Sequence, residues 1–497
     1  MLKSSGGQLP CMDDPQEAAP LPVVEVEERP EAEDRTAEED EPVESLPLPP
    51  GPVGDFASII MQMSRYPFHP FATLGALVGF ATVAARKVRY ENLYPSLFGF
   101  MLAESSNGKE DTQRCVEEAL LASGLDRNHV ISRITGYNSA IEAMMRVWYH
   151  PVLFAGVDEG AGFLVAARKG EYGLQDFLKE VWTKCGRWQH PWKRKTHGGT
   201  VNLQSVYHPA LNILLATQPS AMGSASDFAA IQDGLLPRCV WVVRKDWAMV
   251  PNREAPNHVD DLRVTPDGQA IVARMRELWD WMSPKRERMP TVKYRFKNMY
   301  AASEYFRVEF KHVVGDGEKE GLWPQAVQFG ASPEVQAAFD EFEVECRKNG
   351  APGRGKQAML AGLWGKATEN AKRVALTLAA ARCGADPDVC KIELVEAQWA
   401  IRFIRATVFS GIRWGREHLF ESPFQAQCEM VFSIIDEAGA GIQQQDLTRR
   451  LQHRFRAKEI IEVTATLVLE GRIERVSIQT KGRTANGWRA VRRSPEK

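Results

Sequence analysis

The stretch with the most chemical potential runs from Pro95 to Thr112 and reads PSLFGFMLAESSNGKEDT. Its apolar half is short enough for a buried strand, and it ends abruptly in small polar residues that close on Gly108 and Lys109. A loop closed by glycine can turn its backbone N–H groups onto phosphate oxygens, and the helix that follows adds the positive end of its dipole. The lysine adds a point charge, so the pattern predicts a strand, a phosphate-binding loop and a helix.

This stretch departs from the usual phosphate-loop pattern G-x-x-x-x-G-K-[ST] at two positions. Ala103 stands where the first glycine belongs, and Glu110 stands where a serine or threonine would meet magnesium. Gly-Lys pairs are also common in ordinary loops, which is the alternative interpretation of Gly108 and Lys109.

A second strand-like run, PVLFAGV, ends in Asp158 and Glu159, about 50 residues after Lys109. One carboxylate at a strand end can hold a magnesium-bound water, and its neighbour can orient or deprotonate an attacking water. An acidic pair after a strand also occurs by chance. The spacing leaves room for the helices of an α/β crossover, so the two motifs support one another.

Two further apolar runs have polar neighbours. LNILLAT runs into Gln218 and Pro219, and the run Cys239 to Val243 follows Gly234 to Arg238. A glutamine at a strand end can touch a γ-phosphate or its water, whereas the plainer interpretation is a strand that stops at the proline. Short apolar strands separated by helices predict a mostly parallel sheet, in which ligands bind at the carboxyl ends of the strands.

Together these segments resemble a known family. The order PVGDFASII, NLYPSLFGFMLAESSNGKED, VLFAGVDEG, LNILLATQPS and GLLPRCVWVV is similar to that of the phage and plasmid family of RecA-like replicative helicase or primase-helicase ATPases. Much of that family is known only as a domain of unknown function. Its loop commonly opens with Ala and carries an acidic residue after the lysine. The resemblance covers roughly residues 51 to 420.

The resemblance implies ATP and Mg²⁺ as cofactors and a role for each motif residue. Lys109 would bind the β- and γ-phosphates, Asp158 would serve magnesium, and Glu159 would act on the attacking water. Gln218 would sense the γ-phosphate. The implied nucleotide-binding loop comprises Ala103, Glu104, Ser105, Ser106, Asn107, Gly108, Lys109, Glu110 and Asp111.

Two assignments within this resemblance have competing candidates. Arg238 is the candidate for an arginine that reaches a neighbouring subunit's nucleotide, and Arg244 competes with it. Glu110 could ligate magnesium directly or through water, although its charge also repels phosphate. Thr112 is then the candidate that would supply the missing hydroxyl.

Residues 187–200, RWQHPWKRKTHGGT, form a basic and aromatic stretch between the second and third predicted strands. Such a loop can track a nucleic-acid backbone and stack bases. In ring helicases, loops in this part of the domain point into the central channel, which is what the resemblance implies here. A solvated hairpin with buried tryptophans is the alternative. The candidate DNA-binding residues are Lys193, Arg194 and Lys195.

The overall composition, 44% hydrophobic and 25% charged, is that of a globular protein, and 497 residues suffice for two to four domains. No signal peptide is expected at Met1, and the longest apolar stretch, Phe71 to Ala85, is short for a membrane span. Eight scattered cysteines form no C-x-x-C pair. This argues against a zinc site or disulfide framework and predicts a reducing cytoplasm.

Four segments of different character divide the chain. Residues 1–50 are rich in Pro and Glu, and we expect a disordered acidic tail because this composition buries too little apolar surface to fold. Residues 1–46 carry 14 acidic and 3 basic residues, so the rest of the chain has a net charge of +9. The expected domains are a RecA-like P-loop ATPase domain with N-terminal helices at 51–255, a helical domain at 256–420 and a winged-helix domain at 421–497.

The winged-helix prediction rests on three amphipathic helices, Phe424 to Glu437, Gln443 to Gln452 and Ala457 to Gly471, followed by two strands around a turn. From residue 441 onward 13 basic residues stand against 6 acidic ones. Lys481 and Arg483 at the wing tip are the candidate phosphate contacts.

Binding of a protein by the winged helix is the alternative. The third helix carries Glu459 and Glu462 and a largely apolar face, so it is not an obvious major-groove reader.

The sequence as a whole predicts an α/β, cytoplasmic, ring-forming ATPase, expected to be a hexamer, that hydrolyses ATP at subunit interfaces while moving on single-stranded DNA. It would serve as a DNA replication helicase of a phage or other mobile element. A separate primase or replication initiator is a further expected partner, and no membrane partner is expected.

Two rival functions stay open. One is a nucleotide-binding loader or scaffold with little hydrolysis, which Glu110 favours. The other is a DNA-binding regulator that works through the winged helix, with the core serving only assembly.

Overall fold

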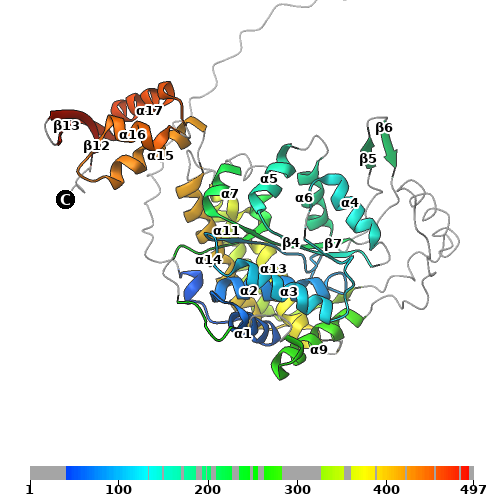
Figure 1. Ribbon diagram of the computed structural model, residues 1–497. Helices are drawn as coiled ribbons and strands as arrows, with labels where there is room; N and C mark the ends of the chain where they lie inside the picture. The colour runs from blue at the N-terminus through cyan, green and yellow to red at the C-terminus, as the bar shows by residue number, and fades with distance from the viewer. Residues whose placement is uncertain are drawn as a thin grey trace, which may run out of the picture. The chain divides into compact units, whose positions relative to one another are not determined.

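A central parallel β-sheet lies at the core of the described residues between 41 and 419 (Figure 1). The structure, a computed structural model, describes residues 41–132, 134–147, 150–169, 173–185, 193–196, 199–202, 209–225, 234–246, 250–255, 262–281, 326–351, 360–384, 386, 389–419, 423–452, 455–480 and 483–491. The sheet has five strands in the order β3-β4-β7-β2-β8. Their bounds are β2 Phe98–Leu102, β3 Val130–Ile131, β4 Val152–Val157, β7 Ala210–Thr217 and β8 Cys239–Val243.

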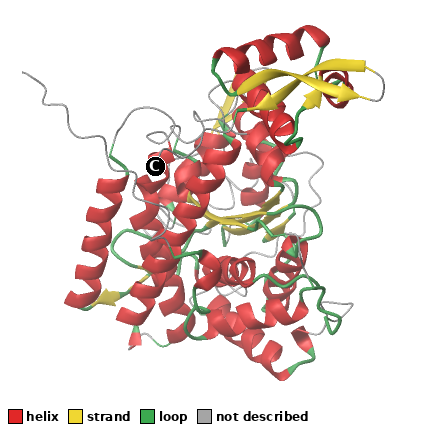
Figure 2. Cartoon of the chain, turned by 90° about the vertical axis from the view of Figure 1, so that its left-hand side faces the viewer, coloured by secondary structure: helices red, strands yellow, loops and turns green. Residues whose placement is uncertain are grey.

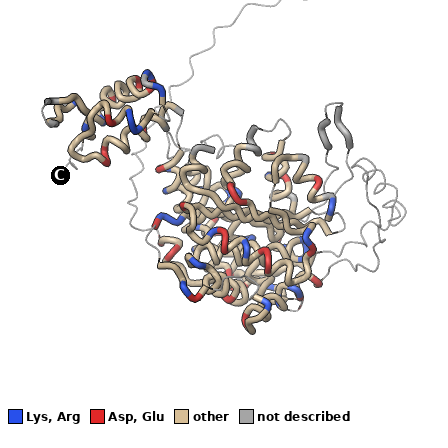
Figure 3. The backbone as a smooth tube through the Cα atoms, viewed as in Figure 1, with Lys and Arg blue, Asp and Glu red and all other residues tan. Residues whose placement is uncertain are grey.

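All neighbouring strands in this sheet are parallel, and none of its residues carries a charge, as the tan tube of the sheet in Figure 3 shows. The residues of β2, β4, β7 and β8 are all buried. Continuous apolar runs without alternation are typical of strands that are covered on both faces. The predicted parallel sheet and its four apolar runs are therefore confirmed, whereas the short edge strand β3 was not predicted.

Helices cover both faces of the sheet (Figure 1). One face packs against α2 (His69–Ala84) and α3 (Lys109–Ala122), with α1 (Pro52–Met63) and α9 (Pro266–Asp280) behind them. The other face carries α4 (Tyr137–Arg146), α5 (Gly160–Lys169), α6 (Leu174–Lys184) and α7 (Pro219–Ala225). Helix α2 is buried all round, in agreement with its unbroken apolar sequence.

The predicted helical domain shares its hydrophobic core with the sheet. It contains α9, α11 (Pro333–Asn349), α13 (Ala367–Cys383) and α14 (Leu394–His418), and η5 (Gly362–Lys366) precedes α13. One continuous cluster of buried residues extends from Val43 to Leu419. Two short parallel pairs, β1 (Val88–Arg89) with β9 (Val327–Gln328) and β10 (Gly330–Ala331) with β11 (Lys391–Ile392), join distant parts of this body. The boundary expected at residue 255 therefore does not separate two cores.

The predicted acidic tail extends too far at its C-terminal end. Residues 1–40 lie outside the described residues, but residues 41–50 pack against α14 around the short helix η1 (Val43–Ser45). Val43 is buried, and the Trp399 indole donates a 3.0 Å hydrogen bond to the Pro47 carbonyl. Arg402 donates two hydrogen bonds to the Glu41 carboxylate. These few apolar contacts and ion pairs order a segment whose composition alone predicts disorder.

The C-terminal segment has a hydrophobic core of its own. Figure 2 shows its helices in red beside the strands of its sheet in yellow. It comprises α15 (Pro423–Glu437), β12 (Ile442–Gln443), α16 (Gln444–Leu451), α17 (Ala457–Leu469), β13 (Ile473–Thr480) and β14 (Arg483–Ala490). The antiparallel sheet has the order β12-β14-β13. The three predicted helices and the hairpin are confirmed, and β12 is an addition.

β5 (Lys193–Thr196) and β6 (Gly199–Asn202) form an antiparallel hairpin within the basic and aromatic stretch of the sequence.

Across the described residues, every helix is too short or too polar to cross a bilayer.

A cluster of basic side chains is buried beside the C-terminal end of α9. The His150 ring stacks on Trp279 with ring centroids 4.2 Å apart, and the Lys87 ammonium donates to the carbonyls of Leu278, at 2.5 Å, and Trp279. Burial first, and then the charges of Lys87 and Arg86, hold the pKa of His150 well below its usual 6.5. His150 is therefore neutral in the folded protein at pH 7.

We expect the free energy of unfolding to decrease below about pH 6.5, because the unfolded chain then binds a proton at His150 that the folded chain excludes. The contribution of neutral His150 to the free energy of unfolding is complete above that pH. As the pH is lowered it falls by up to about 1.4 kcal/mol per pH unit, until the pH reaches the pKa of His150 in the folded state. Urea unfolding at about pH 7.5 and about pH 5.5 measures it. His150→Phe keeps the stacking on Trp279 without titrating, so an equally steep pH dependence in this variant would contradict the assignment.

Candidate active site

The predicted phosphate loop connects the end of β2 to the start of α3. Gly108 precedes the first residue of α3 and has φ 82° and ψ 2°, in the left-handed region. A Cβ atom there would also collide with the Tyr66 carbonyl oxygen. Ser106 in the same loop has φ 63°, which is unusual for a residue other than glycine. The loop is therefore a tightly turned segment that depends on glycine at its last position.

Lys109 is folded back over this loop. Its side chain is only 8% exposed, and its ammonium donates to the carbonyl oxygens of Glu104, at 2.7 Å, and Ala103. Burial lowers the pKa of Lys109 to about 8, although the nearby carboxylates of Glu104 and Glu110 act in the opposite direction. At pH 7 the group keeps its proton, so it places a positive charge against the two carbonyl groups that begin the loop.

The strand order brings three of the sequence motifs to one edge of the sheet. β7 lies between β2 and β4, so the ends of β2 and β4 are two strand spacings apart, about 9.5 Å. The Gln218 side-chain amide, just after β7, donates a 2.7 Å hydrogen bond to the Ser105 hydroxyl in the loop. Ala103 donates its backbone N–H to the Thr217 carbonyl. Gln218 therefore contacts the loop directly.

Asp158 and Glu159 are both exposed at the end of β4, on the other side of β7 from the loop. Glu159 has φ 55°, and its carbonyl accepts from Gly162 in the first turn of α5. The Thr217 hydroxyl accepts from the Ala161 N–H at 3.3 Å, which ties the start of α5 to the end of β7. Residues held in sparsely populated backbone regions concentrate at functional sites, and Ser106 and Glu159 both belong to the candidate site.

A third carboxyl group, which the sequence reasoning missed, lies beside Asp158. Glu117, on α3, projects over the backbone of Gly156, and any side chain at that glycine would collide with it. Burial raises the pKa of Glu117 to about 7, and the charges of Asp158 and Glu118 contribute to the same shift. The sequence signal was weak, because Glu117 shares its side of the helix with Gln113 and Arg114 as well as with Leu120.

Gln113 is a second residue that the sequence reasoning missed. Its side-chain amide is buried one helical turn beyond Lys109 and donates to the carbonyls of Val157, at 3.2 Å, and Leu214, at 2.8 Å. It therefore fastens α3 to both β4 and β7. The sequence offered no clear signal for this residue, because Gln113 lies between Thr112 and Arg114 in the polar first half of the helix.

The three polar residues after Lys109 have different surroundings. Glu110 is exposed in the first turn of α3, whereas the Asp111 carboxylate accepts from the Arg65 N–H at 2.9 Å, the Ser64 hydroxyl and Arg114. Thr112 is buried, its hydroxyl donates to the Gly108 carbonyl, and its methyl group packs against Gly75 of α2. Asp111 therefore anchors the end of α1, and Thr112 does not fit the expected role of a magnesium ligand.

Magnesium takes oxygen ligands and usually keeps several waters beside substrate phosphates. Asp158 and Glu110 are exposed carboxylates at the two motifs, so this donor set fits such an ion. No group of three or more metal-binding side chains occurs among the described residues. Phosphate oxygens and water would therefore have to supply most of the ligands.

The two candidate trans arginines occupy opposite ends of β8. Arg238 precedes the strand, donates to the Gly234 carbonyl and, at 3.4 Å, to the Thr183 hydroxyl, and lies over the Trp182 ring. It is therefore at the edge of the sheet opposite to its own phosphate loop. Arg244 follows the strand and is buried beside the loop of its own chain.

The candidate DNA-binding residues can be placed only in part. Lys193, Arg194 and Lys195 lie on β5 of the hairpin, and Arg483 begins β14. Lys481 and the tryptophans at 188 and 192 lie outside the described residues. Their roles stay predictions.

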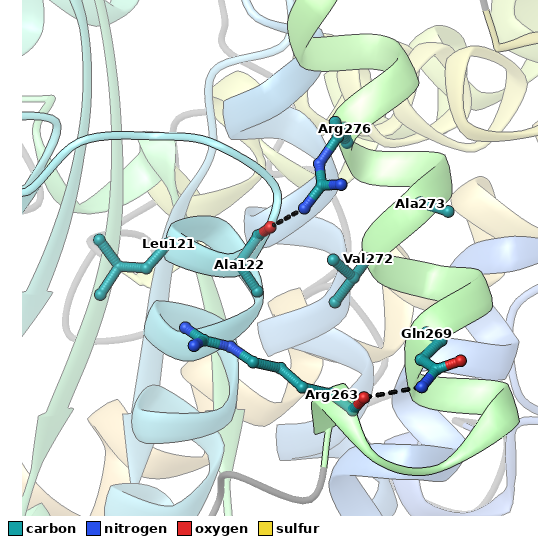
Figure 4. Close-up of a pocket in the computed structure, with 7 residues that line it drawn as sticks. All are labelled: Leu121, Ala122, Arg263, Gln269, Val272, Ala273 and Arg276. Carbon is teal, nitrogen blue, oxygen red and sulfur yellow. Dashed lines mark hydrogen bonds between the residues drawn. The ribbon is translucent and has the colours of Figure 1, made fainter.

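A pocket at the far end of α3 does not belong to this site (Figure 4). It lies between the last turn of α3 and helix α9, where the Arg276 guanidinium donates to the Ala122 carbonyl at 2.6 Å. The phosphate loop is at the other end of the same helix.

Neither a family model nor a curated protein matches this chain. The functional interpretation therefore depends on the geometry of the chain itself.

We expect Gly108→Ala to destabilise the protein, because alanine would have to adopt φ 82° and collide with the Tyr66 carbonyl. The free energy of unfolding should fall by roughly 1–3 kcal/mol, measured by urea denaturation. Gly136→Ala is the matched control, because a Cβ atom there meets nothing within 4 Å. Equal stability of the two variants would show that the loop does not need glycine at position 108.

Proposed function

We propose that this chain is an ATPase with a RecA-like P-loop core, in which the loop 103–108 and Lys109 bind the phosphates of ATP and Glu159 activates the attacking water. The observation that carries the proposal is the meeting of three motifs at one carboxyl edge, with Gln218 hydrogen-bonded to Ser105 of the loop. A chance Gly-Lys pair gives no reason for a strained loop, a buried lysine and an exposed acidic pair to lie at the same edge of the sheet, two strands apart.

The chain's own groups can be assigned to the steps of hydrolysis. Lys109 would exchange its bonds to the Ala103 and Glu104 carbonyls for bonds to the β- and γ-phosphates, where its positive charge is most favourable. Glu159 would accept a proton from the water that attacks the γ-phosphorus, as the bond from phosphorus to the bridging oxygen breaks and ADP leaves. A bound Mg²⁺ held by Asp158 and Glu110 would neutralise charge on the phosphate oxygens.

The motor would assemble as a ring, expected to be hexameric, and move on single-stranded DNA as a replicative helicase of a phage or mobile element. The basic sequence of β5 and the net positive charge of the chain beyond residue 46 support a polyanionic partner. A separate primase or initiator would complete the system.

One observation favours the protein-binding alternative for the C-terminal segment, proposed above as a winged helix. The exposed face of α17 carries apolar side chains, because Ile461 is 64% and Leu469 is 88% exposed. A helix that reads bases in the major groove needs hydrogen-bonding side chains on its exposed face. If this segment binds DNA, contact through the β13–β14 hairpin agrees better with the charges of the segment than contact through α17 does.

We expect ATP hydrolysis that is stimulated by single-stranded DNA, and Glu159→Gln should lower kcat by at least about 10² while ATP still binds. Glutamine keeps the size of the side chain but cannot accept the proton. Phosphate release and equilibrium binding of a fluorescent ATP analogue measure the two quantities. Lys109→Ala is the companion variant and should weaken ATP binding itself. Tight binding of magnesium-ATP by the unaltered chain without any turnover would contradict the motor and favour the loader or scaffold.

Gln218→Ala should lower kcat more than it lowers ATP affinity, because a sensor acts mainly in the transition state. Ser105→Ala removes the same 2.7 Å hydrogen bond from its other side and is the matched control. A fall of about 10-fold to 10²-fold in kcat is expected for Gln218→Ala and a smaller one for Ser105→Ala. Identical steady-state kinetics in both variants would reduce Gln218 to a support of the loop.

A further inference from the structure

Arg244 makes an unusual set of contacts at the end of β8. Its backbone N–H donates to the Leu102 carbonyl at 2.8 Å, which joins the end of β8 to the end of β2. The side chain is only 6% exposed. Its Nη1 donates to the carbonyls of Tyr66, at 3.2 Å, and Asn107, at 3.3 Å, while Nε donates to the Asp246 carboxylate at 3.1 Å.

The guanidinium therefore connects three pieces of chain that meet at the phosphate loop. It lies 4.7 Å from the centre of the Phe68 ring, and Phe68 and Tyr66 both belong to the segment between α1 and α2. The same Tyr66 carbonyl approaches Gly108 so closely that no side chain fits there. Arg244 and Gly108 therefore hold neighbouring peptide groups of the loop close to the segment between α1 and α2.

The bond to Asn107 has a consequence for the direction of the next N–H group. In a trans peptide the carbonyl oxygen of one residue and the N–H of the next point in opposite directions. Because Arg244 holds the Asn107 carbonyl on its own side, the Gly108 N–H is directed away from Arg244. Backbone N–H groups aimed in this way are what a phosphate loop offers its ligand.

We infer that Arg244 is a positioning residue that holds the phosphate loop of its own chain in the nucleotide-binding shape, and is not the arginine that acts on a neighbouring subunit's nucleotide. The inference rests on the proposed function. A planar group with five donors can satisfy several carbonyl oxygens at once, which lysine cannot do. Of the two candidates, Arg238 is then the one left to act in trans.

The first experiment measures equilibrium binding of a fluorescent ATP analogue. Arg244→Ala and Arg244→Lys should both raise the dissociation constant by about tenfold to a hundredfold, because the carbonyls lose a charged partner that only the guanidinium fork can replace. Added guanidinium ion should restore part of the affinity of Arg244→Ala. Lys245→Ala is the matched control, since Lys245 is half exposed, pairs with Glu417 and should leave the affinity unchanged.

Steady-state kinetics separates positioning from action in trans. A positioning residue that shapes the binding site raises KM with little change in kcat, whereas loss of an arginine that stabilises the transition state in trans lowers kcat by about 10³ or more. Unchanged affinity together with a collapse of kcat in Arg244→Lys, which retains the charge and much of the volume, would overturn the inference.

A mixing experiment tests in a second, independent way whether Arg244 acts within its own chain or across subunits. In a mixture of Arg244→Ala and Lys109→Ala chains, every chain with an intact lysine lacks its own Arg244, so ATP hydrolysis measured at ATP concentrations below the raised KM should stay as low as with Arg244→Ala alone. Recovery of hydrolysis in this mixture would mean that Arg244 acts across subunits and would overturn the inference. The same mixture made with Arg238→Ala serves as the reference, because recovery is expected there if Arg238 acts in trans.

The proposed function can fail separately from the inference about Arg244. If the unaltered chain binds no ATP at all, the ATPase proposal fails, and Arg244 then only stabilises the fold of the loop. If the unaltered chain binds ATP and Arg244→Ala binds it equally well, the ATPase proposal survives and the positioning role is refuted.

Discussion

The central sheet is buried on both faces, and that burial constrains where polar chemistry can occur in this protein. None of its five strands carries a charged residue, and helices from distant parts of the sequence cover both sides. A charged group within such a strand would lose its hydration without a partner. Charged side chains therefore appear where the strands end. Because the strands are parallel, the polar residues that follow β2, β4, β7 and β8 gather at one edge.

Hydrogen bonds between elements hold this edge in shape. Gln113 joins α3 to two strands, Gln218 joins β7 to the loop, and Arg244 joins β8 to the loop from the opposite side. Each contributes about 1 kcal/mol on its own, but removing one partner of a buried pair costs more because the other is left unsatisfied. This framework tolerates strained backbone at Ser106 and Glu159, which a mobile loop would relax.

Negatively charged side chains outnumber positively charged ones at this edge of the sheet. Lys109 and Arg244 are the cations at the loop, and Arg244 is paired with Asp246, whereas Asp158, Glu159, Glu117 and Glu110 all lie on elements that border the loop. A triphosphate would add further negative charge, so a divalent cation is the natural counterpart of this arrangement. Burial is the main cause of the raised pKa of Glu117, and the neighbouring Asp158 carboxylate adds to the same shift.

The sequence by itself determined the elements and the residues that end them, because these depend on short-range patterns. Apolar runs of strand length gave β2, β4, β7 and β8, and their flanking residues include Lys109, Asp158 and Gln218. Only the tertiary structure decided that β7 lies between β2 and β4, that Thr112 faces α2, and that Arg244 braces the loop of its own chain. Strand order and side-chain partners join residues that are far apart in the sequence, 137 positions for Arg244 and Asn107, and no local periodicity encodes such pairings. The same reason explains why residues 41–50, polar and rich in proline, are packed against a helix from the far end of the core.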